Sequence, residues 1–510
     1  MANEIELKLR ISKSDIPKLK RQLAAIASTS PSVQISKPCT HKTLSTYYDT
    51  PDLELLDRGI SLRLRRAERK WIQTIKDTGN ALSGLHQRRE LESEVNSGQL
   101  DFSKIADPPY TTLFDHAVLR NALIPIFSTD VQRTTWQLSF ENGDQVELVL
   151  DIGELIAGDS REPICEIELE FKQGHQGRLF EFALLLQENI PLSIENTSKA
   201  QRAYAYYRHQ PLKIVKSTPV KLRRKMHSND ALKQIVQACL MQLQGNQNMV
   251  LYGNDVEGVH QMRIALRRLR SALNVFRGII RKQSSAHIIE ELVWITTVLG
   301  DARDLDVFVT QTLPPMLQQM QNQPSLTVLT KKAKQERKQA YINVREAIAS
   351  QRYQHLLLTL GDWLENQHWR KQNMSETTVD TIANIMLTKR FKSLKKMGKD
   401  LEQAEPEERH ETRIAAKKLR YLAEFFAELY PPKNTKPFIK SLSKLQDQLG
   451  IMNDISVTSG LLMKLMGQKP PRHLMTAKHL IDGWNAHKLL PCTTDMDAAW
   501  ELFSQQKPFW

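Results

Sequence analysis

The chain lacks the features that mark several common protein classes. It has four cysteines in 510 residues, namely Cys39, Cys165, Cys239 and Cys492. None stands in a CxxC pair or in the spacing of a zinc finger, which excludes a disulfide scaffold and a cysteine metal site. No apolar run reaches the ~18 residues of a membrane span, and charge at position 4 is unlike a signal peptide. We therefore expect reduced thiols in a soluble, cytoplasmic protein.

Positive charge is unevenly distributed along the chain. Of 71 basic and 57 acidic side chains, residues 1–210 hold 26 and 29, and residues 211–510 hold the other 45 and 28. The C-terminal part thus carries all the excess positive charge, which predicts a polyanionic partner such as polyphosphate, nucleic acid or an anionic surface. Because no glycine-rich phosphate loop occurs in the sequence, side chains would have to hold any phosphate.

Charged and aliphatic residues alternate in several N-terminal segments. In residues 4–11, Glu4, Glu6 and Lys8 share one face of a strand and aliphatic side chains share the other, because successive side chains point to opposite sides. The pattern returns in residues 62–65 and 166–171. Like charges on one buried face are unfavourable unless a metal, a phosphate or an opposite charge lies between them. Such strands predict a barrel with a charged lumen and an apolar exterior.

The length predicts at least two domains. Residues 1–205 mix strands with a few helices, residues 206–225 are a basic linker, and residues 226–505 are helical by period. Eight segments have strand character, which is enough to close a small barrel. They are residues 3–11, 42–49, 58–67, 70–77, 87–95, 131–140, 145–152 and 162–171. Helical patterns lie near residues 14–26, 101–120 and 177–188.

The helical part contains an internal repeat. Its two copies share a basic motif and, further along, a Leu-Gly pair followed by an aspartate, at one common offset. The corresponding residues are His260, Arg263, Arg267, Arg270, Gly300 and Asp304 in the first copy, and His410, Arg413, Lys417, Arg420, Gly450 and Asp454 in the second. We expect copies at about 226–375 and 376–505. The predicted fold class is α+β: a closed antiparallel eight-stranded β-barrel tunnel with flanking helices, then an all-α domain of two pseudo-symmetric helical bundles.

The charged strand faces suit phosphate and metal. Carboxylates suit Mg²⁺ or Mn²⁺, whereas arginine and lysine suit phosphate oxygens. A tunnel with both could hold a polyphosphate chain and position a water in line with one phosphorus. The alternative is a solvated lattice of salt bridges on an open sheet, which the alternation on three strands at once disfavours.

The N-terminal motifs resemble those of the CYTH family, the triphosphate tunnel metalloenzymes. They are Glu4-x-Glu6-x-Lys8, Tyr48-Asp49-Thr50, Gly59 to Arg65, Thr74-Ile75-Lys76, Arg88-x-Glu90-x-Glu92, Arg133 with Trp136, Asp151-x-Gly153, Glu166-x-Glu168-x-Glu170 and Ser198-Lys199-Ala200. The resemblance implies that triphosphate is bound by Lys8, Arg63, Arg65, Lys76, Arg133 and Lys199. It implies divalent metal on Glu4, Glu6 and two of Glu166, Glu168 and Glu170. The implied catalytic set is Glu4, Glu6, Lys8, Glu90, Asp151, Glu166 and Glu168.

The helical motifs resemble the CHAD domain. On a helical wheel, His260, Arg263, Arg267 and Arg270 form a basic stripe apart from the apolar face, and His410, Arg413, Lys417 and Arg420 form a second one. The resemblance implies that these eight residues bind inorganic polyphosphate in a basic groove. A solvated face balanced by Asp304 and Asp454 is the rival interpretation. Nucleic acid is disfavoured because the stripes lack interleaved aromatic residues.

The leading hypothesis is a metal-dependent triphosphatase, a hydrolase that converts inorganic triphosphate to pyrophosphate and phosphate. The helical domain would anchor the protein on polyphosphate. Its rivals are a non-catalytic polyphosphate-binding protein that serves for localisation, a thiamine or nucleoside triphosphatase, and an adenylate cyclase. The aromatic candidates for stacking on an organic group are Tyr47, Tyr48, Trp71 and Trp136, and we expect them to pack under flanking helices instead. No membrane partner is expected.

Overall fold

The computed structural model describes residues 2–208, 211–321, 323–370, 377–399, 401, 404–489 and 492–510. The chain divides into two compact units, Met1–Pro211 with Ala349–His368, and Leu212–Ile348 with Trp369–Trp510. The boundary expected between the two helical copies, and the side chain of Cys492, lie outside the described residues. Cys39, Cys165 and Cys239 are free thiols.

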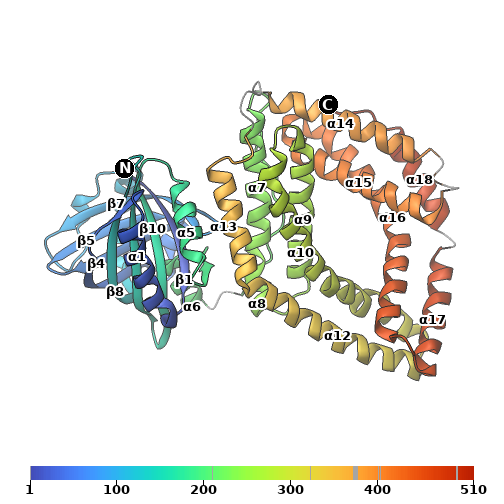
Figure 1. Ribbon diagram of the computed structural model, residues 1–510, viewed down its shortest axis with the longest axis horizontal. Helices are drawn as coiled ribbons and strands as arrows, with labels where there is room; N and C mark the ends of the chain where they lie inside the picture. The colour runs from blue at the N-terminus through green and yellow to red at the C-terminus, as the bar shows by residue number, and fades with distance from the viewer. Residues whose placement is uncertain are drawn as a thin grey trace. The chain divides into compact units, whose positions relative to one another are not determined.

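Eight antiparallel strands close into a barrel in the first unit (Figure 1). In order around the barrel they are β1 (Ala2–Ile11), β10 (Ser160–Gln173), β9 (Gln145–Ala157), β8 (Ile124–Phe140), β3 (Cys39–Asp49), β4 (Ile60–Ala67), β5 (Lys70–Asp77) and β7 (Leu85–Val95). The ring closes because β7 pairs with β1. Each strand expected from the sequence is present, and the predicted barrel is confirmed.

Short elements complete the first unit. The strands β2 (Val33–Ile35), β6 (Asn80–Leu82) and β11 (Leu192–Ile194) join the same sheet. Three residues are too few for a period-2 pattern to show, so the sequence did not reveal them. The helix α2 (Glu54–Asp57) fills the turn between β3 and β4.

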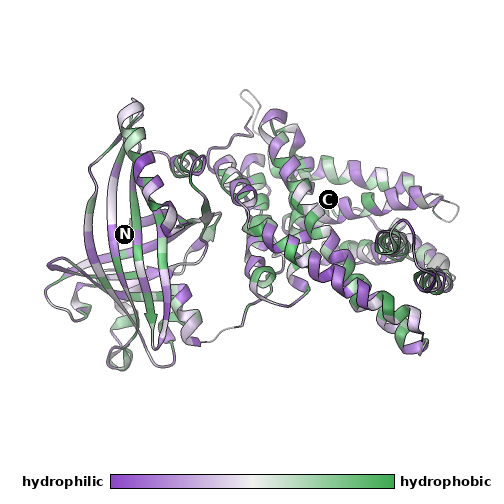
Figure 2. Ribbon diagram, turned by 60° about the horizontal axis from the view of Figure 1, so that its bottom comes forward, coloured by the Kyte–Doolittle hydropathy of each residue, from purple (hydrophilic) through white to green (hydrophobic). Residues whose placement is uncertain are grey.

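The outward face of the barrel is apolar and is covered by helices. Leu7 and Leu9 of β1 are fully buried against Leu19 of α1 (Ile16–Thr29) and Phe180 of α5 (Arg178–Gln187). Two further apolar clusters lie under α6 (Lys199–Arg208) and under α3 (Pro108–Phe114) with α4 (Ala117–Ala122). Burial of each such leucine contributes roughly 1.5–3 kcal/mol to the stability of the fold. Figure 2 shows hydrophilic and hydrophobic residues alternating along the strands, as the sequence predicts.

A helix from far along the chain belongs to the first unit. α13 (Gln351–Glu365) lies beside α5 (Figure 1), and Leu358 joins the apolar cluster under β1. The Oε1 atoms of Gln351 and Gln354 accept hydrogen bonds of 3.0 and 2.9 Å from the backbone N–H groups of Leu192 and Ile194. α13 therefore covers the edge strand β11, whose N–H groups would otherwise stay unpaired.

The second unit is helical and repeats three helices. α7 (Ser228–Gly245), α9 (Glu257–Val275) and α10 (Lys282–Val307) recur as α14 (Val379–Met397), α15 (Pro406–Phe426) and α16 (Pro432–Met466). The remaining α-helices are α8 (Gln247–Tyr252), α11 (Leu313–Gln319), α12 (Pro324–Ala349), α17 (Arg472–Leu489) and α18 (Cys492–Ser504). The recurrence confirms the predicted duplication. Among the described residues, no helix combines the length and the apolarity that crossing a membrane requires.

Candidate active site

The strand register sets acids opposite bases inside the barrel. Lys8 of β1 lies opposite Glu168 of β10, and Arg133 of β8 lies opposite Asp151 of β9. Directly opposed side chains share a face and lie close enough to pair. The alternation in the sequence therefore becomes a lattice of opposite charges in the lumen.

Most of the predicted tunnel residues line one cavity of about 210 Å³. They are Glu4, Glu6, Lys8, Arg63, Arg65, Lys76, Glu90, Arg133, Asp151, Glu168, Glu170 and Lys199. Glu166 lies behind this lining, where it is fully buried and accepts a 3.0 Å hydrogen bond from Arg202. The barrel brings all thirteen positions into one charged region.

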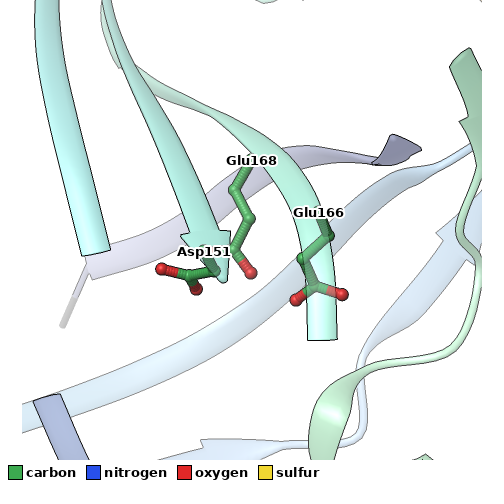
Figure 3. Close-up of side chains that lie close together, drawn as sticks. All are labelled: Asp151, Glu166 and Glu168. Carbon is green, nitrogen blue, oxygen red and sulfur yellow. The ribbon is translucent and has the colours of Figure 1, made fainter. Parts of the chain in front are cut away.

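Three carboxylates form a cluster that could hold a metal ion. Asp151, Glu166 and Glu168 each offer an oxygen, and these atoms all lie within 4.8 Å of one another. Figure 3 shows Glu166 and Glu168 on one strand and Asp151 on its neighbour. The Nζ atom of Lys199 lies 2.8 Å from Asp151 and 2.9 Å from Glu168, and it also pairs with Glu166. Glu170, the last acid of the Glu166-x-Glu168-x-Glu170 motif, lies outside the cluster and pairs with Lys172 at 2.6 Å.

Two carboxylates of the cluster, Asp151 and Glu168, are ionised despite their burial. Burial opposes ionisation of Asp151, but Lys199 and Arg133 outweigh it and lower its pKa to about 2. Lys199 and Lys8 hold the pKa of Glu168 well below its ordinary value against the same desolvation. Both groups are therefore anionic at neutral pH, as ligands of a divalent cation must be. An all-oxygen donor set of this kind fits Mg²⁺ or Mn²⁺.

A second acidic pair lies on β1. Arg88 Nε donates a 2.6 Å hydrogen bond to Glu4, and another guanidinium N–H binds Glu6. Lys76 Nζ lies 2.7 Å from Glu4. Burial raises the pKa of Glu4, but Lys76 and Arg88 outweigh it and lower the pKa below its usual range.

One cation of the lumen has no acidic partner. Arg65 is half-buried and forms no ion pair among the described residues, although its Nε lies 3.4 Å from the hydroxyl of Ser45. Burial together with Arg63 and Arg133 lowers its pKa to about 10. The Nε atom of Arg63 is likewise buried without a hydrogen-bond partner in the described part of the chain. An anion in the cavity would satisfy both guanidinium groups.

The two basic stripes of the second unit converge. Arg267 of α9 lies close enough to Arg413 and Lys417 of α15 to lower the pKa of both. Burial, reinforced by Arg413 and Arg267, lowers the pKa of Lys417 to about 7. The Nε atoms of Arg267, Arg413 and Arg420 are buried with no hydrogen-bond partner among the described residues. Acidic side chains balance these cations only at long range, since Arg413 lies 3.7 Å from Asp454 and Arg420 lies 3.7 Å from Glu424.

Two domain families match the chain. The CYTH domain matches residues 2–204, and the CHAD domain matches residues 234–463. The chain therefore contains a CYTH domain and, after it, a CHAD domain.

Individual relatives resemble each part. An inorganic triphosphatase of Haemophilus influenzae is 33% identical over 208 residues, which are 40% of this chain and 55% of that protein. The chain thus spans about half the length of this curated relative. The crystal structure of the CHAD domain from the plant Ricinus communis is 28% identical, with a TM-score of 0.52 over 58% of this chain and 98% of that one.

Arg88 is a residue of the CYTH tunnel to which sequence reasoning gave no role. It stands two residues before Glu90 on β7 and lines the same cavity. The alternation of Arg88, Glu90 and Glu92 on one strand face is the signal that would have found it. Arg202 was also missed, because it reaches Glu166 from α6, and a strand pattern carries no information about that helix.

Tyr47 lies in the CYTH tunnel, although the sequence suggested that it packs under a helix. Its ring stacks on Phe127 at 4.5 Å, yet Tyr47 lines the cavity opposite Arg63. Burial raises the pKa of this phenol, but Arg63 and Arg65 outweigh that effect and lower it. Trp136, in contrast, is buried in the apolar cluster as expected.

The repeated glycines of the CHAD domain make room for the basic stripes. A Cβ at Gly300 would lie 2.6 Å from Nη1 of Arg263, so a larger residue there would push this flexible guanidinium aside. Gly450 lies near Arg413 in the second copy. The sequence did not predict a hydrogen bond between the two copies of the repeat. The buried Arg268 of α9 donates it to Glu424 of α15 at 2.9 Å. His260 is half-buried beside Arg263, and Arg270 is exposed at the end of its stripe.

Proposed function

We propose that the CYTH tunnel hydrolyses inorganic triphosphate to pyrophosphate and phosphate with the help of Mg²⁺ or Mn²⁺. The observation that carries the proposal is one cavity lined both by Arg65, which forms no ion pair with any described residue, and by Asp151 and Glu168 of the carboxylate cluster. The cavity of about 210 Å³ is smaller than the ~300–1,000 Å³ typical of pockets for organic ligands. This size favours a bare triphosphate over thiamine triphosphate, a nucleoside triphosphate or the ATP of an adenylate cyclase.

The charge balance of the tunnel supports metal dependence. Eight basic and eight acidic described side chains line the cavity. A triphosphate brings several further negative charges, which this balanced lining cannot neutralise. Divalent cations that enter with the substrate would restore neutrality. When bound, such an ion neutralises phosphoryl oxygens and acidifies a coordinated water.

The residues divide into two roles. Lys8, Arg63, Arg65, Lys76, Arg133 and Lys199 bind phosphate oxygens, with Arg65 and Arg63 the least satisfied in the free protein. Asp151, Glu166 and Glu168 hold the divalent cation. Before the cation binds, Lys199 supplies positive charge to these three carboxylates. Glu4, Glu6 and Glu90 complete the acidic lining, and one carboxylate of the lumen orients the attacking water.

We further propose that the CHAD domain binds inorganic polyphosphate across α9 and α15. The converging guanidinium groups with unsatisfied Nε atoms support this assignment. A polyanion would remove the mutual repulsion that now lowers the pKa of Lys417. We place the CYTH domain at residues 1–205, a basic linker at 206–225 and the CHAD domain at 226–505. The free thiols are in keeping with a cytoplasmic protein.

Product analysis with a matched pair of variants tests the tunnel. Wild type should release phosphate and pyrophosphate from triphosphate only with Mg²⁺ or Mn²⁺, and Asp151→Asn and Glu6→Gln should each lose at least ~100-fold in kcat/KM. The control Asp159→Asn changes an exposed acid in the turn that follows β9 and should match wild type.

Three outcomes would overturn the assignment. Equal rates for Asp151→Asn and Asp159→Asn would remove the cluster from the reaction. Formation of cyclic AMP from ATP, or faster hydrolysis of thiamine triphosphate, would replace the substrate. Tight polyphosphate binding without turnover at any metal concentration would leave a binding protein only, and Arg263→Ala with Arg413→Ala should weaken that binding in either case.

A further inference from the structure

A pocket of about 780 Å³ lies in the second unit, between α14, α18 and the segment that follows α18. Its walls include Phe391 of α14, Trp500 of α18 and Trp510. None of its lining residues belongs to the tunnel or to the basic stripes. The pocket is therefore a separate feature that the proposed activity does not use.

Lysines line one side of this pocket. Lys392, Lys395 and Lys396 follow the spacing i, i+3 and i+4, which places them on one face at the end of α14, and Lys399 follows the helix and lines the same pocket. They form no ion pair with any described residue, and no acidic side chain is among the described residues that line the pocket. Like charges at these spacings repel each other, so the row favours a bound anion. A row of lysines alone is often a solvated surface, and the aromatic walls distinguish this one.

The indole rings are held in fixed positions. Trp510 donates a 2.8 Å hydrogen bond from Nε1 to the hydroxyl of Thr388, and its ring meets Phe391 edge-on at 5.7 Å. Trp500 lies directly on Gly398, where a Cβ would approach the ring to 2.0 Å. Both indoles remain partly exposed. They therefore form a preorganised aromatic surface beside a row of cations.

We propose that this pocket binds a nucleotide, with the base against the indoles and the phosphates on the lysines. Inorganic polyphosphate would use the lysines but gain nothing from three aromatic walls, and a neutral aromatic ligand would not need four cations. Stacking platforms beside cations are the usual way in which proteins hold nucleotide units without reading their sequence. The volume fits one nucleotide. The basic stripes on α9 and α15 lack such aromatic residues, and we assign inorganic polyphosphate to them.

ADP is the suitable probe because it is a nucleotide without the triphosphate group that the tunnel is proposed to hydrolyse. Binding of ADP to the full-length chain should quench tryptophan fluorescence, and calorimetry gives the affinity. Lys392→Ala combined with Lys396→Ala should weaken ADP binding at least tenfold, and so should Trp510→Leu. Lys389→Ala removes a lysine of the same helix that does not line the pocket and should change the affinity less than twofold.

The design separates this pocket from the other anion sites. Arg65→Ala in the tunnel and Arg413→Ala in the stripe should leave ADP binding intact, and pyrophosphate should bind the pocket at least tenfold more weakly than ADP. Because Trp510→Leu can disturb folding, the surface lysine pair provides an independent reading. The proposal fails if the lysine pair leaves ADP affinity unchanged, if pyrophosphate binds as tightly as ADP, or if Arg65→Ala abolishes binding. It also fails if oligonucleotides bind with an affinity that rises with length, because the ligand is then a strand.

Discussion

The pH dependence of polyphosphate binding offers a sharp test of the CHAD domain, through Lys417. This lysine is half-buried on α15, where Arg413 and Arg420 of the same helix and Arg267 of α9 face it, with Asp454 of α16 as the acid nearby. Burial and these cations lower its pKa from the ordinary 10.5 to about 7. In the free protein Lys417 is therefore half neutral at pH 7 and largely neutral at pH 9.

Bound polyphosphate reverses this shift, since a polyanion favours the charged amine. Binding above pH 7 then requires the uptake of up to one proton, and affinity falls as pH rises. With a bound pKa near 10.5, linkage gives a loss of about 50-fold between pH 7 and pH 9. The ~50-fold loss corresponds to about 2.3 kcal/mol of binding free energy.

The matched variant is Lys417→Arg, which keeps the charge but does not titrate in this range. Calorimetry of polyphosphate binding at fixed ionic strength, at pH 7, 8 and 9, should show the loss in wild type and a flat profile in the variant. Burial and Arg303 lower the pKa of His260 from 6.5, and because this histidine is present in both proteins its own titration cancels in the comparison. Parallel profiles for wild type and Lys417→Arg would refute the reasoning, as would release of protons on binding.

Three further changes test the CYTH part. Arg88→Ala leaves Glu4 and Glu6 short of a buried partner and should lower the free energy of unfolding by about 3 kcal/mol in urea titration. A loss below ~1 kcal/mol would mean that Lys76 suffices to neutralise Glu4 and Lys8 suffices to neutralise Glu6. Tyr47→Phe removes a hydroxyl that lines the cavity beside the arginines, so KM for triphosphate should rise several-fold with little change in unfolding, and an unchanged KM would place the hydroxyl away from the substrate. Leu358→Ala should destabilise the barrel unit by about 2–5 kcal/mol, measured by thermal unfolding, and wild-type stability would show that α13 does not anchor there.

The sequence predicted the barrel because charge alternation is a local signal. Glu4, Glu6 and Lys8 must share one face wherever their strand lies, so a charged lumen follows once several such strands close. The exact composition of the carboxylate cluster did not follow, because it depends on register. Asp151 and Glu166 are opposed across β9 and β10, and Glu170 sits four residues further along the strand. No pattern within one segment encodes that choice.

Contacts between distant segments escaped prediction for the same reason. Helical period identifies α13 as a helix, but nothing in its residues states that Gln351 and Gln354 bind β11. The link from Arg268 to Glu424 joins positions 156 residues apart. The repeat could be predicted, since a common offset is visible in the sequence. The role of its glycines could not, because only the structure shows that Gly300 lies against Arg263.

The docking of α13 on the barrel has a consequence for synthesis. Domains usually begin to fold from the N-terminus while the ribosome is still adding residues. Here the last piece of the first unit is encoded some 150 residues after its last strand, so the edge of β11 stays uncovered while most of the intervening helices are being made. A nascent chain arrested before Gln351 should therefore expose a strand edge open to mispairing, and chaperone capture should peak over that interval of translation.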